Sequence, residues 1–291
     1  MANLKDIRRR IRSVKNMQQI TKAMKMVSAA RLRRAQERVI AARPYAKTMT
    51  RVLEDLAARA KEYSHPLLEP RGDESYLFVF VTSDKGLCGA FNTNMLRGGS
   101  AFIRDHPEKH VRIMPIGRRG RDFFRRRGVE IPAEHVNVTA KNVTFEDAAA
   151  IAREVMDLYL DEELAIDKVF LYYNEFRSVI SQVVTLKQIL PIGGLERTEE
   201  PSGETLIDYV YEQPPEQIFA RLLPKYIETQ VFQALVESTA SEHGARMTAM
   251  DAASKNASEL VDRLTLYANR VRQAAITNEI IEVVSGAQAL G

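Results

Sequence analysis

The chain has 291 residues, of which 45% are apolar and 27% charged, a balance typical of one full-sized folded domain with extensions. No stretch approaches the roughly 18 apolar residues of a membrane-spanning helix, so we expect no direct membrane insertion. The N-terminus lacks the apolar core of a signal peptide. A single cysteine, Cys88, excludes an internal disulfide and a cysteine-rich metal site.

The net charge of +4 hides a strong asymmetry along the chain. Residues 1–62 carry 17 Lys and Arg against 5 Asp and Glu, whereas the remainder carries 25 against 33. A concentrated basic segment favours an acidic partner, which could be nucleic acid, anionic lipid or carboxylates on protein. Residues 1–44 contain no aromatic side chain, which disfavours both nucleic acid and a membrane surface. The pattern therefore favours a protein partner, with a merely solvated helix surface as the plain alternative.

Residues 1–62 are predicted to form a long helix that needs a partner helix. Apolar residues recur at intervals of three and four, which is the pattern of a coiled-coil seam. Pro44 lies inside this segment and removes one helical hydrogen bond, so we expect a bend near Ile40, or alternatively a break. The predicted seam positions are Leu4, Ile7, Ile11, Val14, Ala35, Val39, Ala42, Ala46, Met49, Leu53 and Leu56.

The middle of the chain, residues 63–205, shows a different periodicity. Short apolar runs alternate with helical segments, which predicts a Rossmann-like α/β domain with a largely parallel sheet. Thr144 and Asp147 have the spacing of a capping box at a helix start. Strands are predicted at 76–82, 111–116, 169–173 and 179–190. Helices are predicted after the loop 83–92 to about residue 106, at 118–127 and at 144–159. An exposed linker is predicted at 191–204.

The loop 83–92, SDKGLCGAFN, lies where doubly wound folds hold phosphates, between a first strand and a helix. Its glycine spacing matches neither GxGxxG nor the P-loop pattern, so a structural turn is favoured over a nucleotide site. Cys88 has no histidine nearby and is expected to be a buried structural thiol rather than a nucleophile. The histidines show no convincing ligand spacing, and we expect no metal and no cofactor.

The last part of the chain, residues 206–291, predicts a second long helix from Pro214 to a stop at Gly286. Over roughly 70 residues such a helix spans on the order of 100 Å. Its predicted seam positions are Leu260, Leu264, Tyr267, Val271 and Ala274.

Several local sequences resemble one known family. They are IRSVKNMQQITKAMKMVSAARLRRAQ at 11–36, RPYA at 43–46, SEHGARMTAMDAASKNASELV at 241–261 and RQAAITNEIIEVVSGAQAL at 272–290. Together with SDKGLCGAFN they resemble the gamma subunit of bacterial F-type, proton-translocating ATP synthase. The resemblance covers the whole chain and is weakest at 98–165 and 191–215. No insertion resembles the paired-cysteine switch of chloroplast gamma subunits.

The resemblance implies a non-catalytic rotor shaft. In that family the terminal helices form an antiparallel coiled coil inside a hexamer of alpha and beta subunits, and the α/β domain inserted between them contacts the epsilon subunit and the c-ring. Torque passes between the c-ring and the catalytic hexamer, which couples proton flow to ATP synthesis or hydrolysis. The implied location is peripheral, at the cytoplasmic face of the bacterial plasma membrane.

The resemblance also implies partner contacts for particular residues. Lys22, Met24 and Lys25 match positions near an acidic loop of the beta subunits. Arg246 and Gln273 match positions that contact loops low in the catalytic domains, and because they are 27 residues apart on one helix they point to roughly opposite sides. Arg246 is expected to be exposed. An apolar bearing at the top of the hexamer is implied for Ile280, Ile281, Val283 and Val284.

Two other functions remain open from the residues alone. The loop at 83–92 would suit a nucleotide-dependent α/β enzyme with helical arms, and the basic first helix would suit a coiled-coil adaptor for nucleic acid. The rotor shaft is favoured over both, with no nucleic-acid partner expected.

Overall fold

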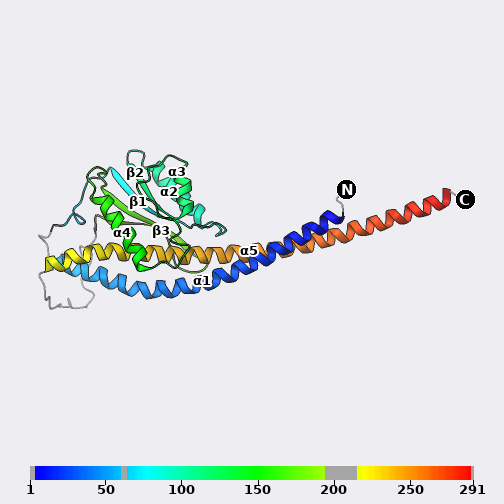
Figure 1. The fold of residues 1–291 in the computed structure, drawn as a ribbon, viewed down its shortest axis with the longest axis horizontal. Helices are drawn as coiled ribbons and strands as arrows, with labels where there is room; N and C mark the ends of the chain where they lie inside the picture. The colour runs from blue at the N-terminus through cyan, green and yellow to red at the C-terminus, as the bar shows by residue number, and fades with distance from the viewer. Residues whose placement is uncertain (1–3, 60–63, 194–214, 290–291) are drawn as a thin grey trace. The chain divides into compact units, whose positions relative to one another are not determined.

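The computed structural model describes residues 4–59, 64–193 and 215–289 (Figure 1). Two very long helices lie at the ends of the sequence, α1 at Leu4–Arg59 and α5 at Pro215–Ala289. Between them the chain forms four strands and three shorter helices. By internal contacts the chain divides into two compact units, Met1–Ser28 with Arg246–Gly291, and Ala29–Ala245. The division cuts through both long helices, and the domain boundaries predicted at 1–62, 63–205 and 206–291 stay a prediction.

The unit of residues 29–245 is built on a four-stranded sheet in the order β2-β1-β3-β4. The strands are β1 (Ser75–Val81), β2 (His110–Ile116), β3 (Lys168–Phe176) and β4 (Gln182–Leu190). β1 pairs in parallel with β2 and β3, and β4 is an antiparallel edge, which confirms the largely parallel sheet.

The last strand starts later than predicted. The sequence favoured a strand from residue 179, whereas β4 begins at Gln182. Ser178 and Ser181 exchange backbone hydrogen bonds of 3.0 and 3.2 Å, and this tight turn reverses the chain between β3 and β4. The apolar residues at 179 and 180 therefore belong to the turn, with Ile180 86% exposed.

Helices cover both faces of the sheet, as expected when the strand order reverses between right-handed crossovers. On one face Phe78 and Phe80 of β1 pack with Met95 of α2 (Phe91–Asp105) and Phe124 of α3 (Arg118–Arg125). The alternate β1 residues are equally buried and face the other side. α4 (Phe145–Leu160) lies on the side of the sheet away from α2 and α3 (Figure 1).

α1 and α5 form an antiparallel pair in each unit. In the unit of residues 29–245, Arg43 Nε lies 3.5 Å from Oε1 of Glu237, a carboxylate only 2% exposed. In the unit of residues 1–28 with 246–291, Lys25 Nζ lies 2.6 Å from Oδ1 of Asp251. From the Lys25 contact to the Arg43 contact the residue number rises along α1, while the number of the partner on α5 falls from 251 to 237. The two helices therefore run in opposite directions.

The seam predicted for α1 is confirmed over its described length. α1 continues through Pro44, so the alternative of a break is wrong, and the bend near Ile40 stays a prediction. The side chain of Leu56 lies outside the described residues. Buried seam positions are Ile7, Ala35, Val39, Ala46, Met49 and Leu53, and half-buried ones are Leu4, Ile11, Val14 and Ala42.

The seam predicted for α5 is partly wrong. Leu264 and Val271 are half-buried as expected, but Leu260 and Tyr267 are each 44% exposed and Ala274 is also exposed. Small residues take the seam instead, since Ala257 and Ala268 are buried. Alanine brings two helix backbones close together, which displaces the larger side chains by one position around the helix. The pattern of large apolar residues alone therefore located the wrong stripe.

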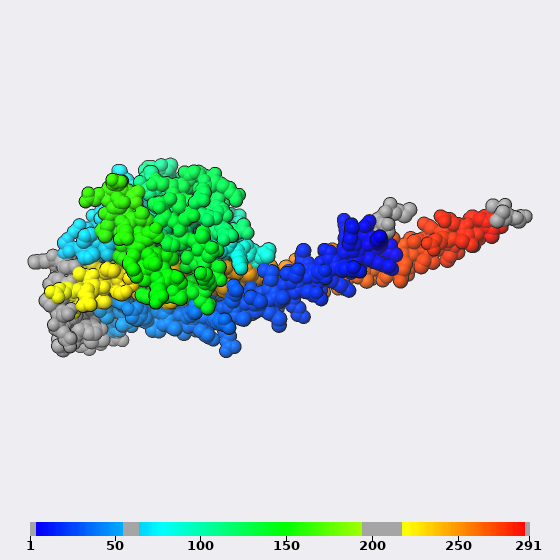
Figure 2. All heavy atoms as spheres, viewed as in Figure 1, coloured from blue at the N-terminus to red at the C-terminus, as the bar shows by residue number. Residues whose placement is uncertain are grey.

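The predicted stop of α5 at Gly286 is also wrong, because the helix continues to Ala289. A glycine inside a helix costs only about 1 kcal/mol relative to alanine, and the residues after it, Ala287, Gln288 and Ala289, are good helix formers. Every described residue from Arg272 onward is exposed. In Figure 2 this orange-to-red end of α5 continues past the blue start of α1 with no described element beside it.

The predicted capping box of α4 is confirmed, and it yields a stability prediction. Oγ1 of Thr144 accepts a hydrogen bond from the Asp147 amide at 3.2 Å, and Oδ2 of Asp147 accepts one from the Thr144 amide at 2.9 Å. Thr144→Ala removes one cap, a loss of about 1 kcal/mol. We expect hydrogen exchange in the first turn of α4 to accelerate about fivefold by mass spectrometry. Thr144→Ser keeps the hydroxyl and should exchange like the parent; equal acceleration in both variants would contradict the capping role.

Candidate functional site

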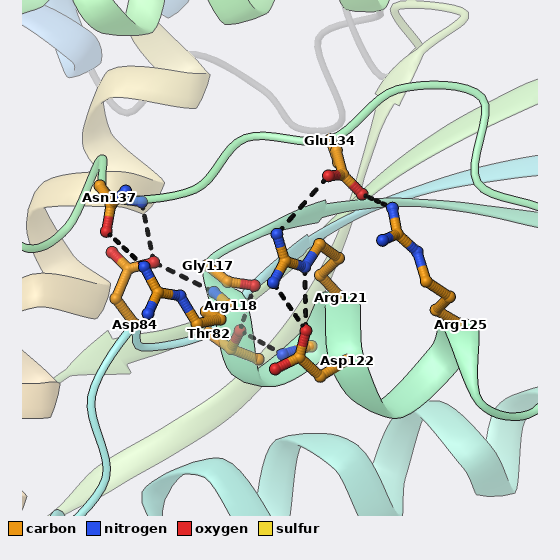
Figure 3. Close-up of polar contacts among 10 residues, drawn as sticks. Thr82, Asp84, Gly117, Arg118, Arg121, Asp122, Arg125, Glu134 and Asn137 are labelled. Carbon is orange, nitrogen blue, oxygen red and sulfur yellow. Dashed lines mark hydrogen bonds and ion pairs between the residues drawn. The ribbon is translucent and has the colours of Figure 1, made fainter.

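The carboxyl end of β1 is the place where a doubly wound sheet would bind a phosphate, and here a side chain of the protein itself fills it (Figure 3). Asp84 follows β1 and is buried. Its Oδ1 accepts hydrogen bonds from the backbone amides of Arg118 at 3.1 Å and Asn137 at 2.8 Å, and its Oδ2 accepts one from Oγ1 of Thr139 at 3.2 Å. The start of α3 therefore already holds a carboxylate.

The rest of this edge is equally occupied by internal contacts. Oγ1 of Thr82 accepts a hydrogen bond from the Gly120 amide at 2.9 Å. Gly117 has a φ of 104°, and a Cβ there would lie 2.2 Å from the Thr82 carbonyl oxygen, so only glycine fits. Nearby, Arg121 contacts both Asp122 at 2.8 Å and Glu134 at 3.7 Å (Figure 3). The edge is built to fix loops onto the sheet.

Cys88 is buried, with 2% of its surface exposed, as the sequence predicted. Nδ2 of Asn92 lies 3.1 Å from its Sγ and 2.7 Å from Oγ of Ser83. The Ser83 amide in turn donates to Oδ1 of Asn92 at 3.1 Å. The motif SDKGLCGAFN is thus a closed network of side chains and backbone, and the structural turn is the interpretation that these contacts support. Among the described residues no cluster of His, Cys, Asp or Glu could hold a metal ion.

The predicted contacts on α1 lie on a basic face of the unit of residues 1–28 with 246–291. Lys22 is exposed and Met24 is half-buried beside the seam. Lys25 was expected to face a partner, but its Nζ is engaged with Asp251 at 2.6 Å. Nζ of Lys255, one turn further along α5, lies 3.0 Å from the other oxygen of Asp251. Of the two predicted lysines, the structure therefore brings Lys25 to an internal carboxylate and leaves Lys22 exposed.

Sequence reasoning missed Asp251 and Lys255, although two signals pointed to them. They stand four residues apart, the spacing of a helical ion pair. An antiparallel register would then have placed Asp251 opposite the basic face of α1. The hydrogen bond from Lys25, followed by that from Lys255, lowers the pKa of the Asp251 carboxyl from its usual value of 3.8.

The two other predicted contact residues of α5 lie in different environments. Gln273 is exposed. Arg246 was expected to be exposed, and this is wrong, because only 8% of its surface is accessible. A long arginine stem can pack along a helix pair while its charged end finds polar partners, so its charge alone did not indicate exposure. Replacement of Arg246 by alanine would therefore disturb packing as well as any partner contact.

The predicted bearing residues lie on the exposed end of α5. Ile280, Ile281, Val283 and Val284 are 57%, 55%, 72% and 51% exposed. Aliphatic residues on several sides of one solvent-exposed helix are unusual in a monomer and mark an interaction surface. No described helix is long and apolar enough to cross a membrane.

The contact between Lys25 and Asp251 generates a pH prediction. Because the pKa of Asp251 is lowered in the folded chain, the stabilisation is complete above the usual pKa and is lost as pH falls through the lowered value. Lys25→Met should lower the thermal unfolding midpoint near neutral pH, and the difference from the parent should vanish as the solution is acidified well below pH 3.8.

The matched control for this test is Lys22→Met, which removes the same charge from an exposed position of the same helix. It should leave the unfolding midpoint close to that of the parent at every pH. A pH-independent effect of Lys25→Met would show that packing rather than the ion pair is responsible.

The comparisons with known proteins agree over the full length of the chain. A model of the ATP synthase family matches residues 3–290. The ATP synthase gamma chains of Solibacter usitatus and Desulfitobacterium hafniense are 54% and 52% identical, covering 99% and 100% of this chain and 99% and 100% of their own.

Solved structures show the same fold. A chain of the Tetrahymena thermophila mitochondrial ATP synthase central stalk and c-ring is 29% identical, with a TM-score of 0.62 over 81% of this chain and 99% of its own. A chain of the Euglena gracilis mitochondrial enzyme, only 17% identical, reaches a TM-score of 0.68 over 99% of this chain and 94% of its own. With the antiparallel terminal helices and the internally filled sheet edge, these likenesses establish that the chain belongs to the family of ATP synthase gamma chains.

Proposed function

We propose that the chain is the central rotor shaft of a bacterial ATP synthase, which transmits torque between a membrane c-ring and a catalytic hexamer of alpha and beta subunits. The single observation that carries this proposal is the antiparallel pair of α1 and α5, in a chain of this family. The chain itself is non-catalytic in this proposal, in keeping with a sheet edge where Asp84 takes the place of a ligand. It acts peripherally, at the cytoplasmic face of the plasma membrane, beside an epsilon subunit.

The charge distribution suits a shaft that must turn inside a sleeve. Most of the cations on α1 are exposed, and exposed ion pairs contribute only about 0–1 kcal/mol each. Contacts of this strength with carboxylates of the surrounding subunits can break and re-form as the shaft turns. In this proposal Lys22 and Met24 face the acidic loops of the beta subunits. The part of the Lys25 side chain that stays exposed beside Asp251 faces them as well.

The two ends of the contact surface have different chemistry. Gln273 and Arg246 contact loops of the catalytic domains at separate heights along α5. The exposed aliphatic residues at 280–284 form the bearing at the tip, where an apolar surface turns without the directional restraint of hydrogen bonds. The runner-up, a nucleotide-dependent enzyme with helical arms, lacks an open phosphate site at the sheet edge.

Rotation of the chain within the assembled complex tests the proposal directly. The native Cys88 is buried, so Glu162→Cys, in an exposed loop after α4, gives one reactive site for attaching a bead. The complex is immobilised through its alpha or beta subunits and supplied with ATP. We expect continuous rotation of the bead in one direction. A complex that hydrolyses ATP while the bead only fluctuates would overturn the rotor assignment.

The position of Met24 beside the basic face generates a coupling prediction. Met24→Lys adds a third cation next to Lys22 and Lys25, which strengthens a contact that must release during rotation. We expect ATP hydrolysis to persist while proton pumping per ATP, measured by dye quenching in membrane vesicles, falls severalfold. Met24→Leu keeps the apolar character and should pump like the parent. Unchanged proton pumping per ATP in Met24→Lys would contradict the prediction.

A further inference from the structure

A basic hollow lies in the unit of residues 29–245, between α1, α5 and the segment before α4. It has a volume of about 250 Å³. α1 contributes three arginines, α5 contributes three residues on one face, and residues 140–143 close one side. The lining residues used below are Arg31, Arg34, Arg38, Lys141, Asn142 and His243.

The cations around the hollow are concentrated by the helix period. Arg31, Arg34 and Arg38 are spaced three and four residues apart, so they project from the same face of α1. Lys141, in the segment before α4, adds a fourth positive charge to the lining. No aspartate or glutamate is among the described residues that line the hollow. Four like charges are thus held around one space without a carboxylate in its wall.

The arginines differ in what they contact. Nη1 of Arg38 donates to the carbonyl oxygen of Val143 at 3.1 Å, which fixes the wall of the hollow to α1. Within residues 4–59, 64–193 and 215–289, Arg31 and Arg34 make no hydrogen bond or ion pair. Arg33, which does not line the hollow, lies 3.4 Å from Glu37 on another face of α1. Arg33 therefore has a carboxylate beside it, whereas Arg31 and Arg34 project into the hollow and solvent with no such neighbour among the described residues.

The geometry points to a binding site for a small phosphate-bearing anion in this hollow, a role separate from torque transmission. Guanidinium groups bind phosphate through paired, charge-assisted hydrogen bonds, and several around one concave space recognise a multivalent oxyanion. Asn142 adds an uncharged amide donor. The hollow is open to solvent on one side, and its volume of about 250 Å³ matches a compact anion. An occupant would hold α1, α5 and the segment before α4 together.

Isothermal titration of the full-length chain with pyrophosphate tests this site, at constant ionic strength near 0.15 M to screen diffuse attraction. We expect saturable binding. Arg31→Ala with Arg34→Ala should weaken it about tenfold or more, because the fork donors are lost. Arg34→Lys keeps the charge without the fork and should weaken binding less.

The matched control is Arg33→Ala, which removes the same charge from the same helix outside the hollow. Its dissociation constant should stay within about twofold of the parent value. Equal weakening by Arg33→Ala and Arg34→Ala would overturn the site in favour of diffuse electrostatic attraction. Circular dichroism establishes that each variant keeps its helix content.

If the isolated chain associates with itself, that reaction adds heat to the titration, so a second measurement tests the site without calorimetry. Pyrophosphate should protect Arg31 and Arg34, but not Arg33, from modification by phenylglyoxal, mapped by mass spectrometry. Phosphate, pyrophosphate and ADP are compared to find the source of the anion. ADP binding no more tightly than pyrophosphate indicates an inorganic anion, and much tighter ADP binding indicates a nucleotide. Binding of a glutamate-rich peptide without binding of any phosphate compound would overturn the proposal. None of these results depends on rotation.

Discussion

The pairing of α1 with α5 along one seam is the interaction on which the rest of the molecule depends. An isolated helix in water gains little from its own hydrogen bonds, so 56 and 75 residues of helix need a packed face to stay ordered. Each unit of the chain contains a length of both helices. The buried and half-buried positions of α1, taken together, recur every three or four residues through both lengths, including the stretch around Pro44. The proline is tolerated because the seam packing on either side outweighs one lost hydrogen bond.

The side chains of α5 place it in three different surroundings along its length. Beside the sheet its residues are almost all buried, and Oγ of Ser241 donates to the Asn174 carbonyl at 3.2 Å while Gln230 accepts from Nζ of Lys187 at 2.6 Å. Further along, the buried residues are fewer and include Met250, Ala257 and Ala268, and most other residues are half-buried or exposed. Beyond Arg272 the helix loses even that partner among the described residues and exposes aliphatic side chains. One helix thus passes from a protein core to a coiled coil to an end that exposes aliphatic side chains.

Much of the fold followed from the sequence because its signals were local. The strands and the cap at Thr144 depend on neighbouring residues, and they lie close to where the pattern put them. The errors arose where residues far apart in the sequence determine which side chains are buried. The seam of α5 turns by one position because alanine permits close approach to α1, and Arg246 is buried because of what surrounds it. For the candidate contacts, the sequence indicated the basic face, but only the register of the two helices brings Lys25 to Asp251.

The chain has two places that could hold an anion, and they differ in whether a side chain of the protein already fills them. At the carboxyl end of β1 the fold offers a ready phosphate site, and Asp84 fills it with a carboxylate that also fixes the start of α3. At the hollow beside α1 the fold offers no standard site, yet three arginines and a lysine surround a space without a carboxylate. Fold similarity alone would direct attention to the first place, where the chemistry is already complete. At the second, Arg31 and Arg34 have no partner among the described residues, and several cations around one concave space attract an anion more strongly than single exposed cations do.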